Sequence, residues 1–88
     1  MSYWVYMVMC ADGTLYTGIA TDVERRVGEH NGEKARGARY TAARRPVQIV
    51  YRAAFSDRSA AAKEEARIKR LTRAAKDALV AAADARCA

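Results

Sequence analysis

The sequence predicts an α/β fold in which helices flank a small antiparallel β-sheet. Two segments rich in aromatic and β-branched residues, 3–9 and 14–19, come first, and a third, 47–51, follows a helix. The final 36 residues contain fourteen alanines, a composition that favours helix. The predicted order is therefore β-β-α-β-α-α, with a three-stranded antiparallel sheet, and 88 residues suit a single domain spanning 1–88.

The first two strands form a predicted hairpin whose turn contains Asp12 and Gly13. With a two-residue loop, Tyr6 and Tyr16 lie on opposite faces of the sheet, because side chains alternate along a strand. With a three-residue loop closed by Gly13 in the left-handed region, Val8 lies opposite Tyr16. Tyr6 and Tyr16 then share one face. Both registers are compatible with the sequence.

The helix after the hairpin carries two side chains suited to phosphate chemistry. Thr21 and Glu24 have the spacing of a capping box, which predicts a helix over about 22–31. Arg26 and His30 are four residues apart and therefore lie on one face of it. A guanidinium can bind a phosphate group, and an imidazole can move a proton.

The second half of the chain predicts one more strand and two helices. Pro46 stands at the start of the third strand, where proline is tolerated. Ser56 is the predicted cap of a helix that ends near Leu71. Thr72 is the predicted start of a last helix that ends near Ala83.

Positive charge is concentrated in the middle of the chain. Sixteen Lys and Arg against ten Asp and Glu give a net charge of +6, and no acid occurs between Glu33 and Asp57. This basic stripe predicts a salt-sensitive, largely sequence-independent contact with a nucleic-acid backbone. Its cations are Lys34, Arg36, Arg39, Arg44, Arg45 and Arg52.

Several classes of protein are excluded by composition. The longest apolar run, 3–10, is far below the ~20 residues that cross a bilayer, and no secretion signal is apparent. We therefore expect a cytoplasmic protein without a membrane span. One His and two separated Cys cannot form a four-ligand structural zinc site, so any metal must be held mainly by carboxylate and water.

The remaining polar residues suggest a phosphodiester hydrolase. Tyr6 and Tyr16 are ten residues apart on paired strands, Arg26 follows ten residues later, and the second predicted helix carries the adjacent acids Glu64 and Glu65. Phosphoryl chemistry needs a cation for the phosphate, a group that moves a proton and a carboxylate for one divalent metal. Both acids border the apolar stripe of their helix at 100° per residue, so helix geometry does not choose between them.

This pattern resembles the GIY-YIG nuclease superfamily. Trp4-Val5-Tyr6 stands where the family has Gly-Ile-Tyr, and Tyr16-Thr17-Gly18 stands where it has Tyr-Ile-Gly. Arg26 and His30-Asn31 follow at matching spacing, and the resemblance covers about 3–79. It is greatest to the small, stand-alone, single-domain bacterial members. Trp4-Val5 departs from the family pattern but leaves the tyrosine in place.

The resemblance implies a divalent-metal-dependent endonuclease that hydrolyses DNA, including branched or damaged DNA, with a role in DNA repair. In such an enzyme Tyr6 would help activate water beside Tyr16, Arg26 would bind the scissile phosphate, and His30 would assist proton transfer. Glu65, matched in preference to Glu64, would hold one Mg²⁺ or Mn²⁺ ion.

Nucleic-acid contacts are expected around this centre, with DNA favoured over RNA. The residues assigned to them are Gly18, Arg25, Asn31, Lys34, Arg36, Arg39, Tyr40, Arg44 and Arg45. Gly18 would let the backbone pass close to substrate or helix. The larger nucleases of the family carry a separate recognition domain, so here a partner protein is expected to supply specificity. The alternative is a nucleic-acid-binding module that keeps the fold without turnover.

Overall fold

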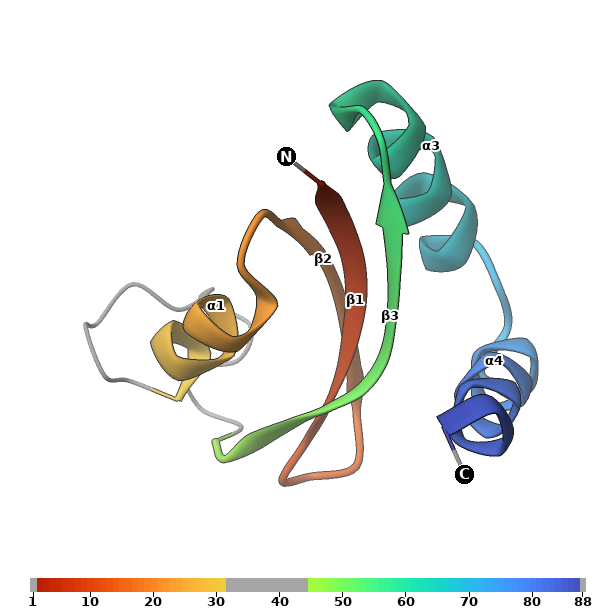
Figure 1. The fold of residues 1–88 in the computed structure, drawn as a ribbon. Helices are drawn as coiled ribbons and strands as arrows, with labels where there is room; N and C mark the ends of the chain where they lie inside the picture. The colour runs from red at the N-terminus through yellow and green to blue at the C-terminus, as the bar shows by residue number, and fades with distance from the viewer. Residues whose placement is uncertain (1, 32–44, 88) are drawn as a thin grey trace.

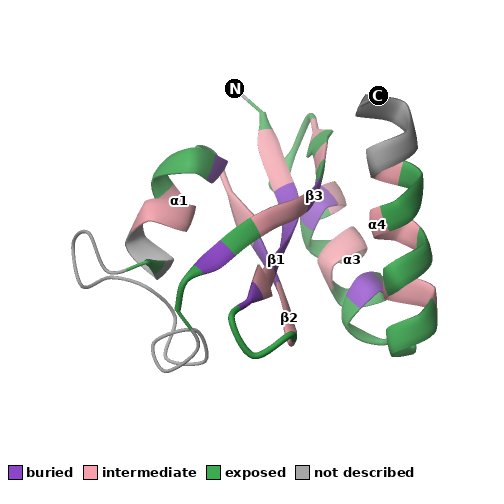
Figure 2. Cartoon of the chain, turned by 90° about the horizontal axis from the view of Figure 1, so that it is seen from below, coloured by how far each residue is buried: buried purple, intermediate pink, exposed green. Residues whose placement is uncertain are grey.

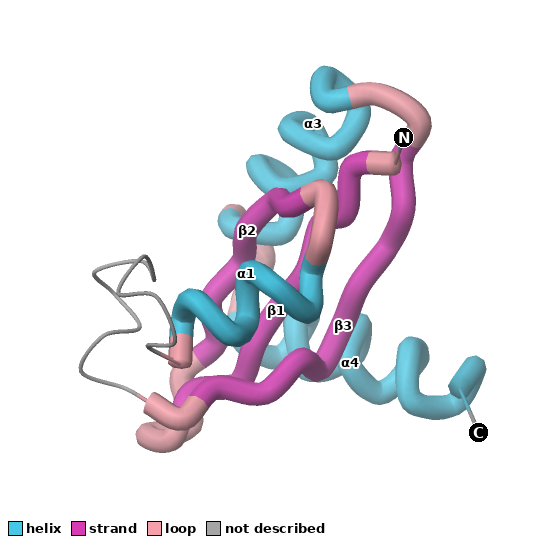
Figure 3. The backbone as a smooth tube through the Cα atoms, turned by 60° about the vertical axis from the view of Figure 1, so that its left-hand side comes forward, coloured by secondary structure: helices cyan, strands magenta, loops and turns pink. Residues whose placement is uncertain are grey.

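A computed structural model describes residues 2–31 and 45–87, without the side chains of residues 29, 30 and 84–87. Its elements are β1 (Tyr3–Cys10), β2 (Leu15–Ala20), α1 (Val23–His30), β3 (Val47–Phe55), α3 (Arg58–Lys69) and α4 (Arg73–Cys87). The strands form one antiparallel sheet in the order β2-β1-β3. Helix α1 covers one face, and α3 and α4 cover the other (Figures 1 and 3). The predicted α/β class and three-stranded antiparallel sheet are confirmed.

The β1–β2 hairpin has the three-residue register. Val8 pairs with Tyr16, and Tyr6 pairs with Gly18. Gly13 has a φ of 85°, the left-handed conformation that closes a three-residue loop and that glycine adopts without strain. Tyr6 and Tyr16 therefore share one face of the sheet, the side that α1 covers.

Alternation along the central strand β1 separates two cores, and Figure 2 shows buried residues concentrated in the strands. On the α3/α4 face the buried residues are Val5, Met7, Tyr51, Ala61 and Ile68. On the α1 face they are Tyr6, Val8, Cys10, Val23 and Val47. Each side chain of β1 points to one side or the other, so this strand contributes to both cores.

Strand β3 is longer than the sequence predicted, because its partner strand overrides local propensity. The prediction ended at Tyr51, but pairing with β1 continues through two alanines to Phe55. A register shift between Met7 and Val8 marks an irregularity in this pairing. Beyond it, Arg52 lies directly opposite Tyr6.

Two of the predicted helix caps are wrong by one residue. Asp22, not Thr21, caps α1: its Oδ1 accepts from the backbone N–H three residues on at 3.1 Å. Asp57, not Ser56, caps α3 in the same way at 2.8 Å. In both cases a carboxylate one residue later takes the capping position. Thr72 precedes α4 as predicted, and its hydroxyl accepts from a backbone N–H at 3.2 Å.

Across residues 2–31 and 45–87, none of the helices has the length and apolar character that crossing a membrane requires.

Candidate active site

Tyr6 lies at the centre of the candidate site. Tyr6 is only 1% exposed, and its ring extends across Gly18 on the neighbouring strand. A Cβ built at Gly18 would lie 2.6 Å from the Tyr6 hydroxyl oxygen, a separation that real Cβ contacts do not reach. Gly18 is therefore needed for space. It admits the tyrosine hydroxyl, a role that the sequence interpretation did not assign to it.

The pKa of Tyr6 depends on its burial and on three nearby side chains. Burial first, and then the nearby Tyr16, raise the pKa of Tyr6 to about 12. Arg26 acts in the opposite direction, by its charge and by a side-chain hydrogen bond, while the charge of Glu65 raises this pKa further. An ordinary tyrosine is already neutral near pH 7, and the raised pKa keeps Tyr6 neutral over a wider range of pH. The side chain of Tyr6 thus bonds to Arg26 of α1 and is acted on by the charges of Tyr16 of β2 and Glu65 of α3.

Arg26 is positioned by the start of α1. Its backbone N–H donates to the Asp22 carbonyl at 3.1 Å, and its side chain is half-buried. Val23, on the preceding turn, is 2% exposed and packs into the α1-face core. This packing anchors the helix beside the sheet, so the guanidinium reaches the Tyr6 hydroxyl.

The two acids on α3 have different surroundings. Glu64 accepts two hydrogen bonds from Arg67, at 2.6 and 2.7 Å, which hold the pKa of Glu64 below its usual range. The Glu65 carboxylate lies 3.3 Å from Lys69 Nζ, and its charge acts on Tyr6. The side chain of Glu65 is 25% exposed, so it is only partly covered by the rest of the protein.

A single carboxylate fits only certain metals. In the part of the chain that the structure describes, no three His, Cys, Asp or Glu residues gather as a metal site. Mg²⁺ commonly binds proteins through one or two carboxylates and takes water and substrate phosphates as its other ligands. The partly exposed Glu65, whose charge acts on Tyr6, fits that kind of site, and does not fit a site built entirely from protein ligands.

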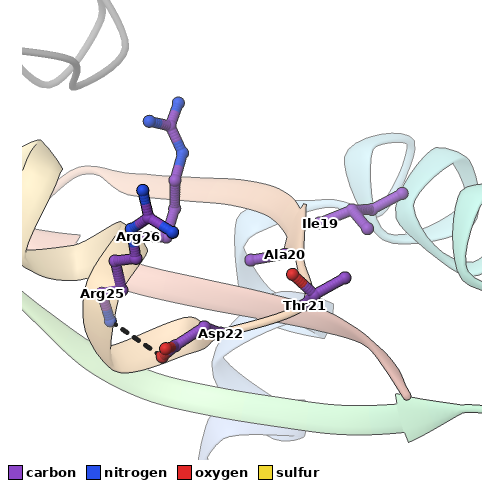
Figure 4. A pocket seen from close by; sticks show the side chains of 6 residues that line it. All are labelled: Ile19, Ala20, Thr21, Asp22, Arg25 and Arg26. Carbon is purple, nitrogen blue, oxygen red and sulfur yellow. Dashed lines mark hydrogen bonds between the residues drawn. The ribbon is translucent and has the colours of Figure 1, made fainter. Parts of the chain in front are cut away.

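Arg25 and Asn31 lie at the two ends of α1. Arg25 is exposed and lines, with Arg26, a pocket of about 290 Å³ between the end of β2 and the start of α1 (Figure 4). Asn31 accepts from Val47 N at 2.7 Å, and its Nδ2 donates to Val47 O at 3.2 Å. Asn31 thus ties the end of α1 to the start of β3. A phosphate contact from Asn31 stays a prediction.

Several predicted contacts lie outside the described residues. These are the His30 side chain and Lys34, Arg36, Arg39, Tyr40 and Arg44. Arg45, just before β3, is exposed.

The sequence interpretation missed a contact that holds α1 against β3. Arg52 Nη1 lies 2.5 Å from Glu24 Oε1, and its guanidinium carbon lies 5.6 Å from the centroid of the Trp4 ring, within cation–π range. The hydrogen bond from Arg52 lowers the pKa of Glu24. The expected capping role of Glu24 is therefore wrong: its carboxylate bonds across to β3. No local sequence signal links residues 28 positions apart.

Known proteins resemble this chain over most of its length. A family model for the GIY-YIG catalytic domain matches residues 2–78. The UPF0213 protein of Desulfotalea psychrophila is 54% identical over 83 residues, which cover 94% of this chain and 74% of that protein. The UPF0213 protein of Natronomonas pharaonis is 51% identical over 79 residues, 90% of this chain and 91% of that one.

Two solved structures share the fold. The solution NMR structure of a UPF0213 protein from Bacillus halodurans has a TM-score of 0.59 at 40% identity, covering 92% of this chain and 84% of that one. The solution NMR structure of an E. faecalis protein has a TM-score of 0.56 at 45% identity, covering 83% and 76%. With the family model spanning both tyrosine strands, α1 and α3, the chain belongs to the GIY-YIG catalytic domain family.

Proposed function

We propose that this protein is an endonuclease that hydrolyses DNA phosphodiester bonds with one divalent cation, Mg²⁺ or Mn²⁺. The GIY-YIG domain belongs to a nuclease superfamily, which supports hydrolysis of nucleic acid. The observation that carries the proposal is that Tyr6 bonds to Arg26 and is acted on by the charge of Glu65, although the three residues belong to different elements. We further propose that DNA is favoured over RNA, that branched or damaged DNA in the cytoplasm is the target, and that a partner protein supplies specificity.

The proposed reaction is attack of water on the scissile phosphate. Arg26 binds a non-bridging oxygen of that phosphate and stabilises its added negative charge. Tyr6, a neutral phenol near pH 7, orients the attacking water by hydrogen bonding, beside Tyr16. The new bond joins the water oxygen to phosphorus, the bond to the leaving oxygen breaks, and the leaving oxygen takes up a proton. His30 is our candidate for assisting the proton transfers.

Glu65 is the proposed ligand of the cation. When bound, the cation would offset negative charge on the leaving oxygen. The ion pair between Glu64 and Arg67 leaves Glu64 poorly suited to this role, because its two oxygens already accept hydrogen bonds. A carboxylate whose charge acts at the proposed site repels phosphate unless a cation offsets that charge. This is our reason for preferring an enzyme over a module that only binds nucleic acid.

Cleavage of supercoiled plasmid and of labelled branched DNA in Mg²⁺ or Mn²⁺ tests the proposal. Arg26→Ala and Glu65→Ala should each remove most activity, whereas the matched control Glu64→Ala should keep it. Tyr6→Phe should slow cleavage about 100-fold or more, the typical contribution of a group that handles the proton. Cleavage that persists in Glu65→Ala would overturn the metal assignment. Salt-sensitive binding without cleavage, unchanged in every variant, would support the binding module instead.

A further inference from the structure

Helix α1 presents different side chains on its different sides. Val23 and Val27 pack into the core between α1 and the sheet. The backbone N–H of Asn31 donates to the Val27 carbonyl at 3.0 Å, so Asn31 continues the last turn of the helix. Glu24 and Asn31 are seven positions apart, close to two full turns, and therefore lie on one flank of the valine stripe. Arg26 lies on the opposite flank, about 140–160° around the helix from both.

The flank that carries Glu24 and Asn31 is bonded to β3 at both of its ends. At the start of α1, Glu24 pairs with Arg52. At the end of α1, the Asn31 side chain bonds to both backbone groups of Val47: Oδ1 accepts from the N–H at 2.7 Å, and Nδ2 donates to the carbonyl at 3.2 Å. The first contact joins largely exposed side chains, and exposed ion pairs contribute little. The contact of Asn31 is therefore the one better suited to fix the helix.

The two hydrogen bonds of Asn31 constrain α1 differently from its apolar packing. Burial of Val23 and Val27 draws the helix onto the sheet, but apolar burial is non-directional and fixes the rotation of the helix less strictly. Hydrogen bonds are directional, and Asn31 makes one as donor and one as acceptor to the same residue of β3. Helix α1 has only eight residues, too few to be stable alone, so its position depends on such outside contacts.

The rotation of α1 decides where the Arg26 side chain lies. Arg26 extends from the flank opposite Asn31 and bonds to the side chain of Tyr6. Because a helix of two turns moves as one body, a rotation that releases one flank from β3 also moves the other flank relative to Tyr6. We propose that Asn31 is a positioning residue of the candidate site: by bonding to Val47 it sets the rotation of α1 and keeps the Arg26 guanidinium at Tyr6.

This inference rests on the proposed nuclease function, in which Arg26 binds the scissile phosphate. Asn31 acts on the reaction through Arg26, and a direct contact from Asn31 to phosphate is the competing role. The chemistry of the amide supplies graded substitutions. An aspartate of the same shape can accept from the Val47 N–H but, when ionised, cannot donate to its carbonyl, and an alanine can do neither.

NMR of the protein without nucleic acid tests the positioning role. The ¹³Cζ signal of the Tyr6 ring is sensitive to the hydrogen bond at its hydroxyl, and Arg26→Ala gives the signal without that bond. Asn31→Ala should shift the signal toward the Arg26→Ala value, and Asn31→Asp should shift it less. The double variant of Arg26 and Asn31 should match Arg26→Ala alone, because the two residues act through one contact. The matched control Gln48→Ala removes an exposed amide next to Val47 and should leave the signal unchanged.

Cleavage kinetics give a second measurement. Asn31→Ala should lower kcat about 10-fold with a smaller change in KM, because a misplaced catalytic group slows the chemical step even where the substrate still binds. A merely structural role would reduce the fraction of folded protein and leave kcat per folded molecule unchanged. Circular dichroism gives that fraction for each variant. If Asn31→Ala does not fold, Asn31→Asp keeps one of the two bonds and serves for both measurements.

An unchanged Tyr6 signal in a folded Asn31→Ala would overturn the positioning role. Weaker binding of labelled DNA together with that unchanged signal would show a direct phosphate contact in its place. A shifted signal with the kcat of the wild type would also overturn it. A shifted signal in a protein that never cleaves would refute only the nuclease function, and Asn31 would still place Arg26.

Discussion

The α3/α4 face of the sheet is closed by apolar side chains such as Val5, Met7 and Ile68, all fully buried. The α1 face buries Val8 and Val23 as well, but it also carries the hydroxyl of Tyr6 beside Arg26. The α3/α4 face is thus packed with apolar side chains, whereas the α1 face also contains polar groups of the candidate site. A chain of 88 residues has only a small hydrophobic core. Because the polar groups of the site are confined to one face of the sheet, the apolar packing of the other face is preserved.

The largest expected effect is on the apolar face. Ile68→Ala should lower the free energy of unfolding by about 2–5 kcal/mol, because it removes a fully buried side chain that links α3 to the sheet. Urea titration followed by circular dichroism measures this loss. If Ile68→Ala lowers the free energy of unfolding by less than about 1 kcal/mol, the α3/α4 face does not carry the stability assigned to it.

The second effect concerns the pH dependence of stability on the α1 face. The pKa of Tyr6 is about 12 when folded, against 10.0 for an ordinary tyrosine. Between these values the unfolded chain loses the proton while the folded chain keeps it, so stability falls as pH rises from about 10 to about 12. The difference between these two pKa values corresponds to roughly 3 kcal/mol of stability lost across the window.

Urea titrations at several pH values between 8 and 12, for wild type and Tyr6→Phe, measure this dependence. The wild type should lose more stability across the window than the variant. The other four tyrosines are present in both proteins, so the difference between the two curves reports the loss of the Tyr6 hydroxyl together with its interaction with Tyr16. Parallel curves would show that Tyr6 is not the group responsible.

A smaller loss of stability is expected from alanine substitutions at two glycines, and its cause differs between them. Gly18→Ala should cost about 1–3 kcal/mol by overpacking, and it should reduce cleavage because the new methyl group displaces the Tyr6 hydroxyl. Gly13→Ala meets open space, so its only cost is a strained positive φ, about 1 kcal/mol, with cleavage unchanged. Denaturation and plasmid cleavage distinguish the two. Equal loss of cleavage in both variants would contradict the spatial role of Gly18.

The smallest expected effect is at the α1–β3 contact. Glu24→Gln and Arg52→Ala should change the midpoint of unfolding little, because both side chains are largely exposed. Each should lower the cleavage rate a few-fold, since the pair holds α1, which carries Arg26. If the contact acts through this single ion pair, the double variant should be no worse than either single one. If the losses in cleavage rate add in the double variant, Glu24 and Arg52 act independently and not through their ion pair.

Much of the fold could be predicted because its signals are local. Segments rich in aromatic and β-branched residues, an Asp-Gly turn and an alanine-rich second half are each read without reference to the rest of the chain. Where two local signals competed, the prediction was off by a residue: Thr21 and Asp22 are both good caps, and the start of the packed helix selected Asp22. The end of β3 was missed because its alanines are strand residues only through pairing with β1.

The sequence by itself determined which residue types are available for chemistry: two tyrosines, an arginine and a pair of acids at definite spacings. Only the tertiary structure decided which of them meet. The hairpin register puts Tyr6 and Tyr16 on one face, and the packing of α3 lets the charge of Glu65 act on Tyr6 while Glu64 pairs with Arg67. Local periodicity specifies which positions share a face, but what lies opposite that face depends on elements far away in the chain.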